Sequence, residues 1–208
     1  YPSDQTFYGY FNDFMTYNSG DWTITTTEAG GGDASEAVTS SAGGALLITN
    51  DAADNDADFF NLKGEGFKLS SSKKAYFSAR FKVSDATQSD FVMGLQITDT
   101  TPLAVSDGVF FIKDDGDTNL DFIVEKDSTS TDTTAIHTME DDTFVTTSFF
   151  IDPDRAAVYY SINNGTPVKV ANTNLPDDEE LTISFGIQNG EAAAKTMTID
   201  YVTAMVER

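Results

Sequence analysis

The residues best spaced for chemistry form an acidic run that begins at position 50. Asp54, Asp56 and Asp58 alternate with other residues, and Glu65 follows eleven positions after Asp54. This spacing matches part of a calcium-binding loop, in which carboxylate oxygens surround the ion. Phe59 stands where such a loop needs glycine for its sharp turn, and no helical pattern flanks the run. We therefore expect a solvated acidic loop without a cofactor, with calcium binding as the alternative.

A second acidic group lies in a predicted turn. Its members are Asp114, Asp115, Asp117, Asn119 and Asp121. As for the first run, the two interpretations are a solvated loop and a site for a hard cation.

Carboxylates that could catalyse glycoside hydrolysis lie along the predicted strand 120–127. The reaction needs two carboxyl groups about 5–5.5 Å apart for retention of configuration, or about 6.5–9.5 Å apart for inversion. Alternation places Asp121, Glu125 and Asp127 on one face, where residues two positions apart are separated by about 6.6 Å along the backbone. Lys126 and the Ser/Thr-rich run after it indicate that the strand ends there. We therefore predict no catalytic residues and no enzyme activity.

His137 is the only histidine, and the chain contains no cysteine. A Ser-His-Asp triad would need this histidine, but the Gly-x-Ser-x-Gly elbow of such enzymes is missing. One histidine cannot build a multi-histidine metal site, and thiol catalysis, disulfides and cysteine-based zinc sites are excluded. We expect His137 to be partly buried or at a strand edge.

Aromatic side chains could bind sugars, because a flat ring stacks on the C–H groups of a pyranose. The only tryptophan, Trp22, lies at the predicted start of a strand. Seven other aromatic residues occur in the first 17 positions: Tyr1, Phe7, Tyr8, Tyr10, Phe11, Phe14 and Tyr17. They could form a glycan platform, part of the core, or a contact between subunits.

The position of these aromatic residues divides them into two groups. Phe11 and Phe14 adjoin the first strand, and we expect them in the core. The expected interface residues are Tyr1, Phe7, Tyr8 and Tyr10. A chain end so rich in aromatic residues would favour aggregation if it were free, and aromatic side chains are frequent anchors of protein interfaces.

The charge of the chain disfavours several kinds of partner. Twelve Lys and Arg against 34 Asp and Glu give a net charge of −22, which repels nucleic acid and anionic lipid. No apolar run approaches the ~18 residues of a membrane-spanning helix. A chain of 208 residues suits one β domain. We therefore predict a single domain, 1–208, that binds neither nucleic acid nor a membrane.

Period-two alternation, which is typical of strands, runs along most of the chain. In residues 76–83 the odd positions are apolar, and the even positions carry Tyr76, Ser78, Arg80 and Lys82. Further strands are predicted at 45–49, 59–63, 66–70, 91–97, 109–113, 120–126, 144–151, 156–162, 167–171, 181–187 and 197–205. The pattern predicts an all-β sandwich of two antiparallel sheets.

Turn residues separate the predicted strands. Asn164-Gly165 predicts a type I′ hairpin, and Asp152-Pro153 predicts a type I turn. Residues 28–44 are rich in Gly, Ser, Ala and Thr, and we expect them to form a surface loop or flexible arm.

Several segments follow one another in an order that carries a resemblance. They are Phe11–Phe14, Asp21-Trp22, Gly43–Thr49, Tyr76–Val83 and Thr198–Val202. This order resembles the concanavalin A-like lectin/glucanase jelly roll, which implies that the first and last strands are adjacent. The chain departs from the enzyme branch because it lacks the run Glu-x-Asp-x-x-Glu, and from the lectin branch because it has a single Trp.

A second resemblance concerns the segment Ser89–Thr100, followed by Ser106–Phe111. These residues are similar to the small acidic decoration, or cement, proteins of tailed phages, cyanophages among them. The resemblance implies a non-enzymatic virion protein on the outer capsid surface, with the major capsid protein and copies of itself as partners. We expect the contacts to come from 1–17 and 28–44. The alternatives are a carbohydrate-binding module on a virion or secreted protein, and a β-glycanase.

Overall fold

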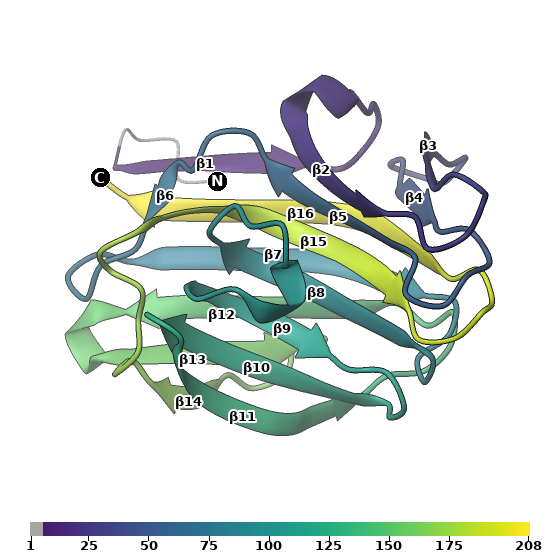
Figure 1. Ribbon diagram of the computed structural model, residues 1–208. Coiled ribbons are helices and arrows are strands. Elements are labelled where there is room, and N and C mark those ends of the chain that lie inside the picture. Colours follow the sequence, from purple (N-terminus) through teal and green to yellow (C-terminus); the bar gives the residue numbers. More distant parts are fainter. Residues whose placement is uncertain (1–5) are drawn as a thin grey trace.

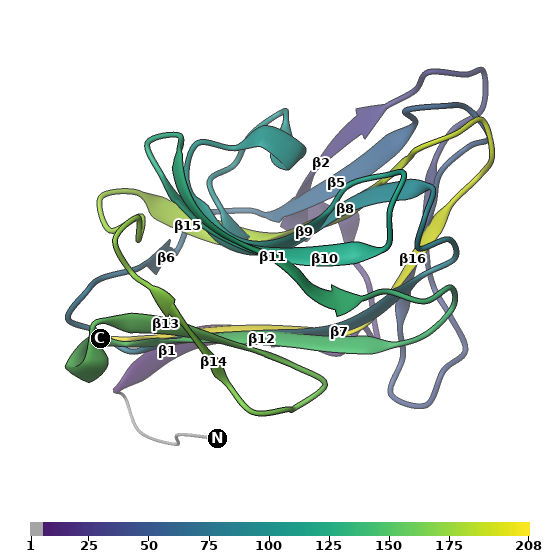
Figure 2. The ribbon, with the colours of Figure 1, turned by 90° about the horizontal axis from the view of Figure 1, so that it is seen from below.

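The computed structural model describes residues 6–208, which form two antiparallel eight-stranded sheets stacked face to face (Figures 1 and 2). We call them sheet A and sheet B. The predicted all-β sandwich is confirmed. No helix within these residues is long and apolar enough to cross a membrane.

Sheet A is built around β16, the last strand, which pairs with three strands from the first half of the chain. Its strand order is β14 (Val168–Ala171), β13 (Ala157–Ile162), β12 (Val145–Asp152), β7 (Ala75–Val83), β16 (Thr196–Glu207), β4 (Leu46–Thr49) and β3 (Ser35–Val38). The strand β1 (Phe7–Asn12) pairs with the second half of β16, so the first and last strands are adjacent as expected.

Sheet B contains the β8–β11 meander and the strands that join it. Its order is β11 (Thr129–Thr138), β10 (Asn119–Lys126), β9 (Gly108–Lys113), β8 (Ser89–Gln96), β15 (Glu180–Asn189), β5 (Ala57–Leu62) and β2 (Trp22–Thr27). The short strand β6 (Phe67–Lys68) pairs with the start of β15. Short 3₁₀ turns lie at η1 (Ser19–Asp21), η2 (Pro102–Ala104) and η3 (Pro153–Arg155).

The core between the sheets is rich in aromatic rings. Phe77 and Phe149 stack with their ring centroids 5.2 Å apart, and Trp22 lies 5.0 Å from Phe185. Trp22 is only 3% exposed. It therefore belongs to the core and cannot serve as the sugar platform that its residue type allowed.

The N-terminal aromatic residues are divided by the alternation of β1. Tyr8 and Tyr10 pack against the core, stacked on Phe67 and edge-on to Trp22 respectively. Phe14 is buried as expected, but Phe11 is 49% exposed. The core prediction for Phe11 is wrong, because an odd position of β1 faces outward when Tyr8 and Tyr10 face inward.

Phe7, on the same side of β1 as Phe11, is partly exposed, whereas Tyr1 lies outside the described residues. Whether these residues contact a partner stays a prediction.

Three local features differ from the sequence expectations. The hairpin after β13 has Asn163 and Asn164 at positive φ, one position earlier than the predicted Asn164-Gly165 turn. Residues 35–38 of the expected loop 28–44 form the strand β3. The strand β11 was not predicted, because its Thr-rich sequence shows no apolar alternation.

Candidate functional site

The outer face of sheet A carries a row of aromatic side chains across three neighbouring strands. Phe150 of β12 lies directly opposite Tyr159 of β13 on one side and Tyr76 of β7 on the other. All three are partly exposed, because the alternating positions Phe77, Phe149 and their neighbours fill the core. Register rather than sequence proximity thus brings the three rings together.

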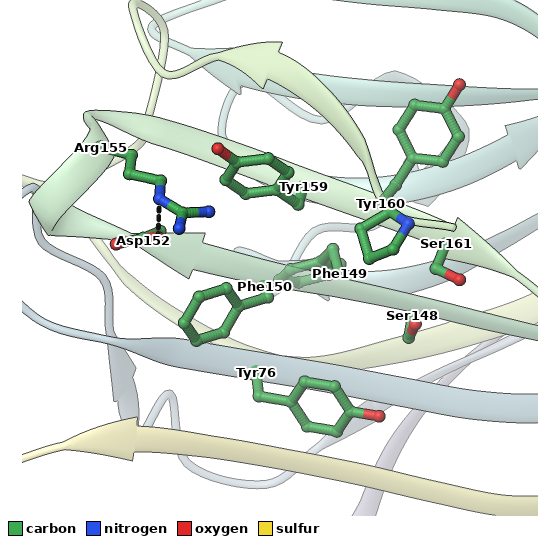
Figure 3. A pocket seen from close by; sticks show the side chains of 10 residues that line it. Tyr76, Ser148, Phe149, Phe150, Asp152, Arg155, Tyr159, Tyr160 and Ser161 are labelled. Carbon is green, nitrogen blue, oxygen red and sulfur yellow. Dashed lines mark ion pairs between the residues drawn. The ribbon is translucent and has the colours of Figure 1, made fainter. Parts of the chain in front are cut away.

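These rings form the floor of a hollow of about 560 Å³. Figure 3 shows the Tyr76, Phe150 and Tyr159 rings side by side on the sheet, with the two serines farther along their strands. The lining also includes Ser148, Ser161, Asp152, Arg155 and Pro167. A cavity of this size, largely aromatic with a few polar groups, is typical of a small-molecule or carbohydrate site.

An ion pair closes one end of the hollow. Arg155 Nε lies 3.6 Å from Asp152 Oδ2 (Figure 3). The hydrogen bond that the Arg155 guanidinium donates to the Tyr159 hydroxyl is the main cause that raises the pKa of Arg155, and Asp152 adds to it. Asp152 also accepts the backbone N–H of Asp154 at 3.1 Å, because it caps the turn η3. The turn predicted at Asp152-Pro153 therefore builds one wall of the site.

A second row, of hydroxyl groups, runs parallel to the aromatic row. Ser161, Ser148, Ser78 and Thr203 are successive cross-strand partners on β13, β12, β7 and β16. Ser161 Oγ donates to Gly165 O at 2.8 Å, and Thr203 Oγ1 donates to Tyr10 O at 3.1 Å. A hydroxyl that donates to the backbone keeps lone pairs that can accept from a ligand. Ser161, Ser148 and Thr203 are partly exposed and place such acceptors beside the ring faces, whereas Ser78 is buried and donates to Thr147 O at 3.1 Å.

Basic side chains on this face form ion pairs with acidic side chains beside them. Arg80 forms an ion pair with Asp200 at 2.7 Å, and the guanidinium also lies 4.0 Å from the Phe144 ring centroid. Lys82 pairs with Asp142 at 3.0 Å. The face is therefore close to neutral on a chain of net charge −22.

The outer face of sheet B is different, because the chain itself covers its apolar residues. Phe59, Val92 and Phe110 form a second apolar cluster, against which Leu103 and Val105 of the loop 98–107 pack. The hydrogen bonds that hold the loop include those from Gln96 Nε2 to Pro102 O at 3.1 Å and from Thr98 N to Glu65 Oε1 at 2.6 Å. Glu65 thus anchors a loop.

The carboxylates considered for glycoside hydrolysis lie at the edge of this covered face. Asp121 and Glu125 both lie on β10, but Asp127 has φ of 51° in the turn after it. The expected strand end at Lys126 is confirmed, and because the β10–β11 turn takes Asp127 out of the strand, Glu125 and Asp127 do not share a strand face.

Asp132 of β11, which the sequence reasoning did not consider, lies opposite Ile123, between Asp121 and Glu125 along β10. Diagonal neighbours of this kind are about 7–8 Å apart. Burial raises the pKa of Glu125, and Asp132 and Asp107 raise it further. For Asp121 burial is again the main cause of a raised pKa, with Asp114, Asp117 and Asp132 adding to it and a hydrogen bond from Ala135 N opposing it.

The acidic run does not converge on one point. Asp54 is exposed, whereas Asp56 and Asp58 are buried and accept hydrogen bonds from an earlier segment of the chain, residues 26–29. Asp56 accepts the Ala29 N–H, and Asp58 accepts the Thr26 hydroxyl at 2.6 Å. The expectation of a solvated loop is wrong for Asp56 and Asp58, because these carboxylates serve as buried hydrogen-bond acceptors.

No calcium-type loop is formed by these carboxylates. Within residues 6–208 no group of three or more His, Cys, Asp or Glu side chains is arranged to hold a metal ion. The second acidic group, at 114–121, is the β9–β10 turn and its flanks, with Gly116 at φ of 84°. His137 is partly exposed on β11, as expected.

The residues of the aromatic row were not selected from the sequence. The signal available was an aromatic residue at the outward position of an alternating strand, as Tyr76 is in 76–83. That signal identifies Tyr76, Phe150 and Tyr159 one at a time, but not their alignment.

Comparison with protein-family models and with curated proteins gives no match. Solved structures match over nearly the whole chain. A protein of unknown function from Shewanella oneidensis MR-1 has a TM-score of 0.66 at 17% identity, covering 97% of this chain and 87% of that one.

Two of the similar structures are a glucanase and a lectin domain. The endo-1,3-β-glucanase from Streptomyces sioyaensis has a TM-score of 0.65 at 12% identity, covering 98% of each chain. The potassium-bound carbohydrate recognition domain of Emp46p has a TM-score of 0.62 at 12% identity, covering 93% of this chain and 94% of that one. The expected concanavalin A-like lectin/glucanase fold is confirmed. Two of these three are a glucanase and a lectin domain, and the function of the third is unknown, so they give no support to the expected capsid role.

Proposed function

We propose that this protein is a carbohydrate-binding β-sandwich that holds its glycan on the outer face of sheet A. The observation that carries the proposal is the row of Tyr159, Phe150 and Tyr76, aligned by register on the floor of one hollow. Ring faces stack on sugar C–H groups, and the serine hydroxyls and the Asp152–Arg155 pair beside them match sugar hydroxyls. The lectin and glucanase folds among the similar structures support the same class of ligand.

The test is a glycan array followed by calorimetry on the glycans that bind. Phe150→Ala removes the central ring and is expected to weaken binding about tenfold or more, since about 1.4 kcal/mol corresponds to a factor of ten. The matched control is Leu103→Ala, which truncates an apolar residue on the outer face of sheet B and should leave affinity unchanged. Loss of binding in the control but not in Phe150→Ala would move the site to sheet B.

A second candidate function, glycan hydrolysis, has one observation in its favour. Glu125 has a raised pKa, and Asp132, a second carboxylate, is its diagonal neighbour across β10 and β11. Reducing-sugar release from β-glucans that is lost in Glu125→Gln would establish this activity. We expect no release, because the loop 98–107 covers the apolar part of the same face.

The capsid-decoration role stays a prediction from the sequence resemblance. It is compatible with a glycan-binding surface and has its own test, co-sedimentation of the purified protein with capsid shells. The major capsid protein and other copies of this chain are the partners that such an experiment would reveal.

A further inference from the structure

The aromatic hollow on sheet A does not end at Tyr76. Directly opposite Tyr76, on the next strand, lies Met205 of β16, and Met205 lies opposite Gly9 of β1. Tyr76 lines the first hollow, whereas Met205 lines a second hollow of about 190 Å³ together with Phe7, Phe11 and Thr203. The two hollows therefore adjoin through one cross-strand pair.

Gly9 is required for this continuity. A Cβ at position 9 would lie 2.5 Å from Ala204 O and 2.7 Å from Met205 Cγ. The Met205 side chain thus occupies the space above Gly9 and extends the apolar floor over β1. Phe11, 49% exposed and 6.5 Å from Tyr201 by ring centroids, borders this end.

The combined surface crosses β13, β12, β7, β16 and β1. Four intervals between five strands span about 19 Å at the usual strand spacing. The hydroxyl row runs beside it as far as Thr203, and Phe11 of β1 lies opposite Thr203, at the end of that row. A surface of this length exceeds a single sugar ring several times over.

The charge on the surface selects against an anionic ligand. Arg155 and Arg80 are paired with Asp152 and Asp200, and Lys74 lies 3.9 Å from Asp154. Lys169, opposite Tyr159, adds one exposed positive charge at the far end. The net charge of −22 on the whole chain repels polyanions before they reach it.

We infer that the two hollows are the two ends of one binding surface for a linear, uncharged polysaccharide that runs across the strands. The inference rests on the proposed function and deepens it, since it specifies an internal stretch of a glycan chain rather than a terminal sugar. Phe150 and Tyr159 hold one end of that stretch, and Met205 and Phe11 hold the other.

The experiment is calorimetric titration with β-1,3- and β-1,4-linked gluco-oligosaccharides of increasing length, from the disaccharide to the hexasaccharide. We expect affinity to rise about tenfold or more between trisaccharide and hexasaccharide, because the added units reach the second hollow. Phe11→Ala and Met205→Ala should each weaken hexasaccharide binding about fivefold and leave trisaccharide binding unchanged. Phe150→Ala should weaken both. Oligogalacturonides, as a charged probe, should bind at least about tenfold more weakly than neutral chains of equal length.

Three outcomes would overturn the inference. If Phe150→Ala abolishes binding but affinity is independent of length and of Phe11, the proposed function stands and the extended surface is wrong. If oligogalacturonides bind more tightly than neutral chains, the ligand class is wrong. If none of the oligosaccharides binds and sedimentation shows a dimer that Phe11→Ala dissociates, the surface is a contact between copies of this chain, and the proposed function fails as well.

Discussion

The outer faces of the two sheets contain similar residues that are used in opposite ways. On sheet B, Phe59 and Phe110 are 4% and 3% exposed, because the loop 98–107 packs over them. On sheet A, Phe150 and Tyr76 stay partly exposed, because no segment of the described chain occupies the hollow above them. Since water-exposed aromatic surface lowers solubility, an aligned row left open on a highly charged protein indicates a binding role.

The two sheets also treat their carboxylates differently. On the outer face of sheet A, Asp152 and Asp200 are paired with arginines. On sheet B, Glu125 faces outward, whereas Asp58 lies on the same side of β5 as the core residue Phe60. Both have raised pKa values, and burial is the main cause of each shift. Mutation and pH can therefore separate the two sheets.

The largest expected effect concerns the covered face. Phe59→Ala should lower the free energy of unfolding by about 3–5 kcal/mol, because it leaves a cavity beneath a packed loop. Phe150→Ala should lower it by only about 1 kcal/mol, since the ring is already partly hydrated. Urea denaturation of the two variants measures both values. Equal losses would show that the two faces are packed alike.

A smaller effect is expected from Asp58 on β5. Burial is the main cause that raises its pKa from the ordinary 3.8 to about 6; Glu36 and Glu28 raise it too, while the Thr26 hydrogen bond opposes them. The native state therefore holds this proton more tightly than the unfolded chain. The contribution to stability is complete below about pH 4 and is lost as pH rises through about 6.

Asp58→Asn should thus be more stable than the wild type at pH 7.5, by about 1–3 kcal/mol, and no more stable at pH 3.5. Denaturation at the two pH values tests this expectation. Asp54→Asn is the control, because its exposed side chain should show no such dependence. A variant that is less stable at pH 7.5 would contradict the assigned cause.

The smallest expected effects are changes in the free energy of unfolding, and they have opposite signs for one carboxylate on sheet A and one on sheet B. Asp200→Asn removes the partner of Arg80 and should lower stability by about 0.5–1 kcal/mol at pH 7. Glu125→Gln should raise stability slightly at pH 7, because burial favours the protonated acid, and should have no effect below about pH 4. Thermal melts of both variants at two pH values are sufficient. If both variants lose the same stability at pH 7, the carboxylates of the two sheets do not differ in the way proposed.

The strands could be predicted wherever one face is buried and the other is wet. Alternation in 76–83 matches β7 closely, and its outward residues include Tyr76. The strand β11 could not be predicted in this way, because it lies at the edge of sheet B and is largely exposed. Apolar residues on both faces, as in Val109–Ile112, are typical of a strand covered on both sides, but the pattern does not identify the segment that covers it.

The candidate site could be predicted only in part. Tyr76 and Phe150 are 74 positions apart, and cross-strand register alone aligns them. Trp22 was misleading, since residue type suggests a platform whereas packing places the ring in the core. Asp132 could not be predicted as a neighbour of Glu125 either, because the turn at Asp127 sets the register that brings the two strands together.

The place of β15 and β16 within the sheets has a consequence for how the chain assembles. Each is a middle strand, β15 between β8 and β5 and β16 between β7 and the strands β1 and β4, yet both lie within residues 180–207. The meanders β8–β11 and β12–β14 can form early from local hairpins, but sheet B cannot join its two halves before β15 is available, and sheet A cannot do so before β16. Such long-range closure gives slow folding. Until then β7 and β8 present unpaired edges, and the repulsion from a net charge of −22 is what keeps those intermediates apart.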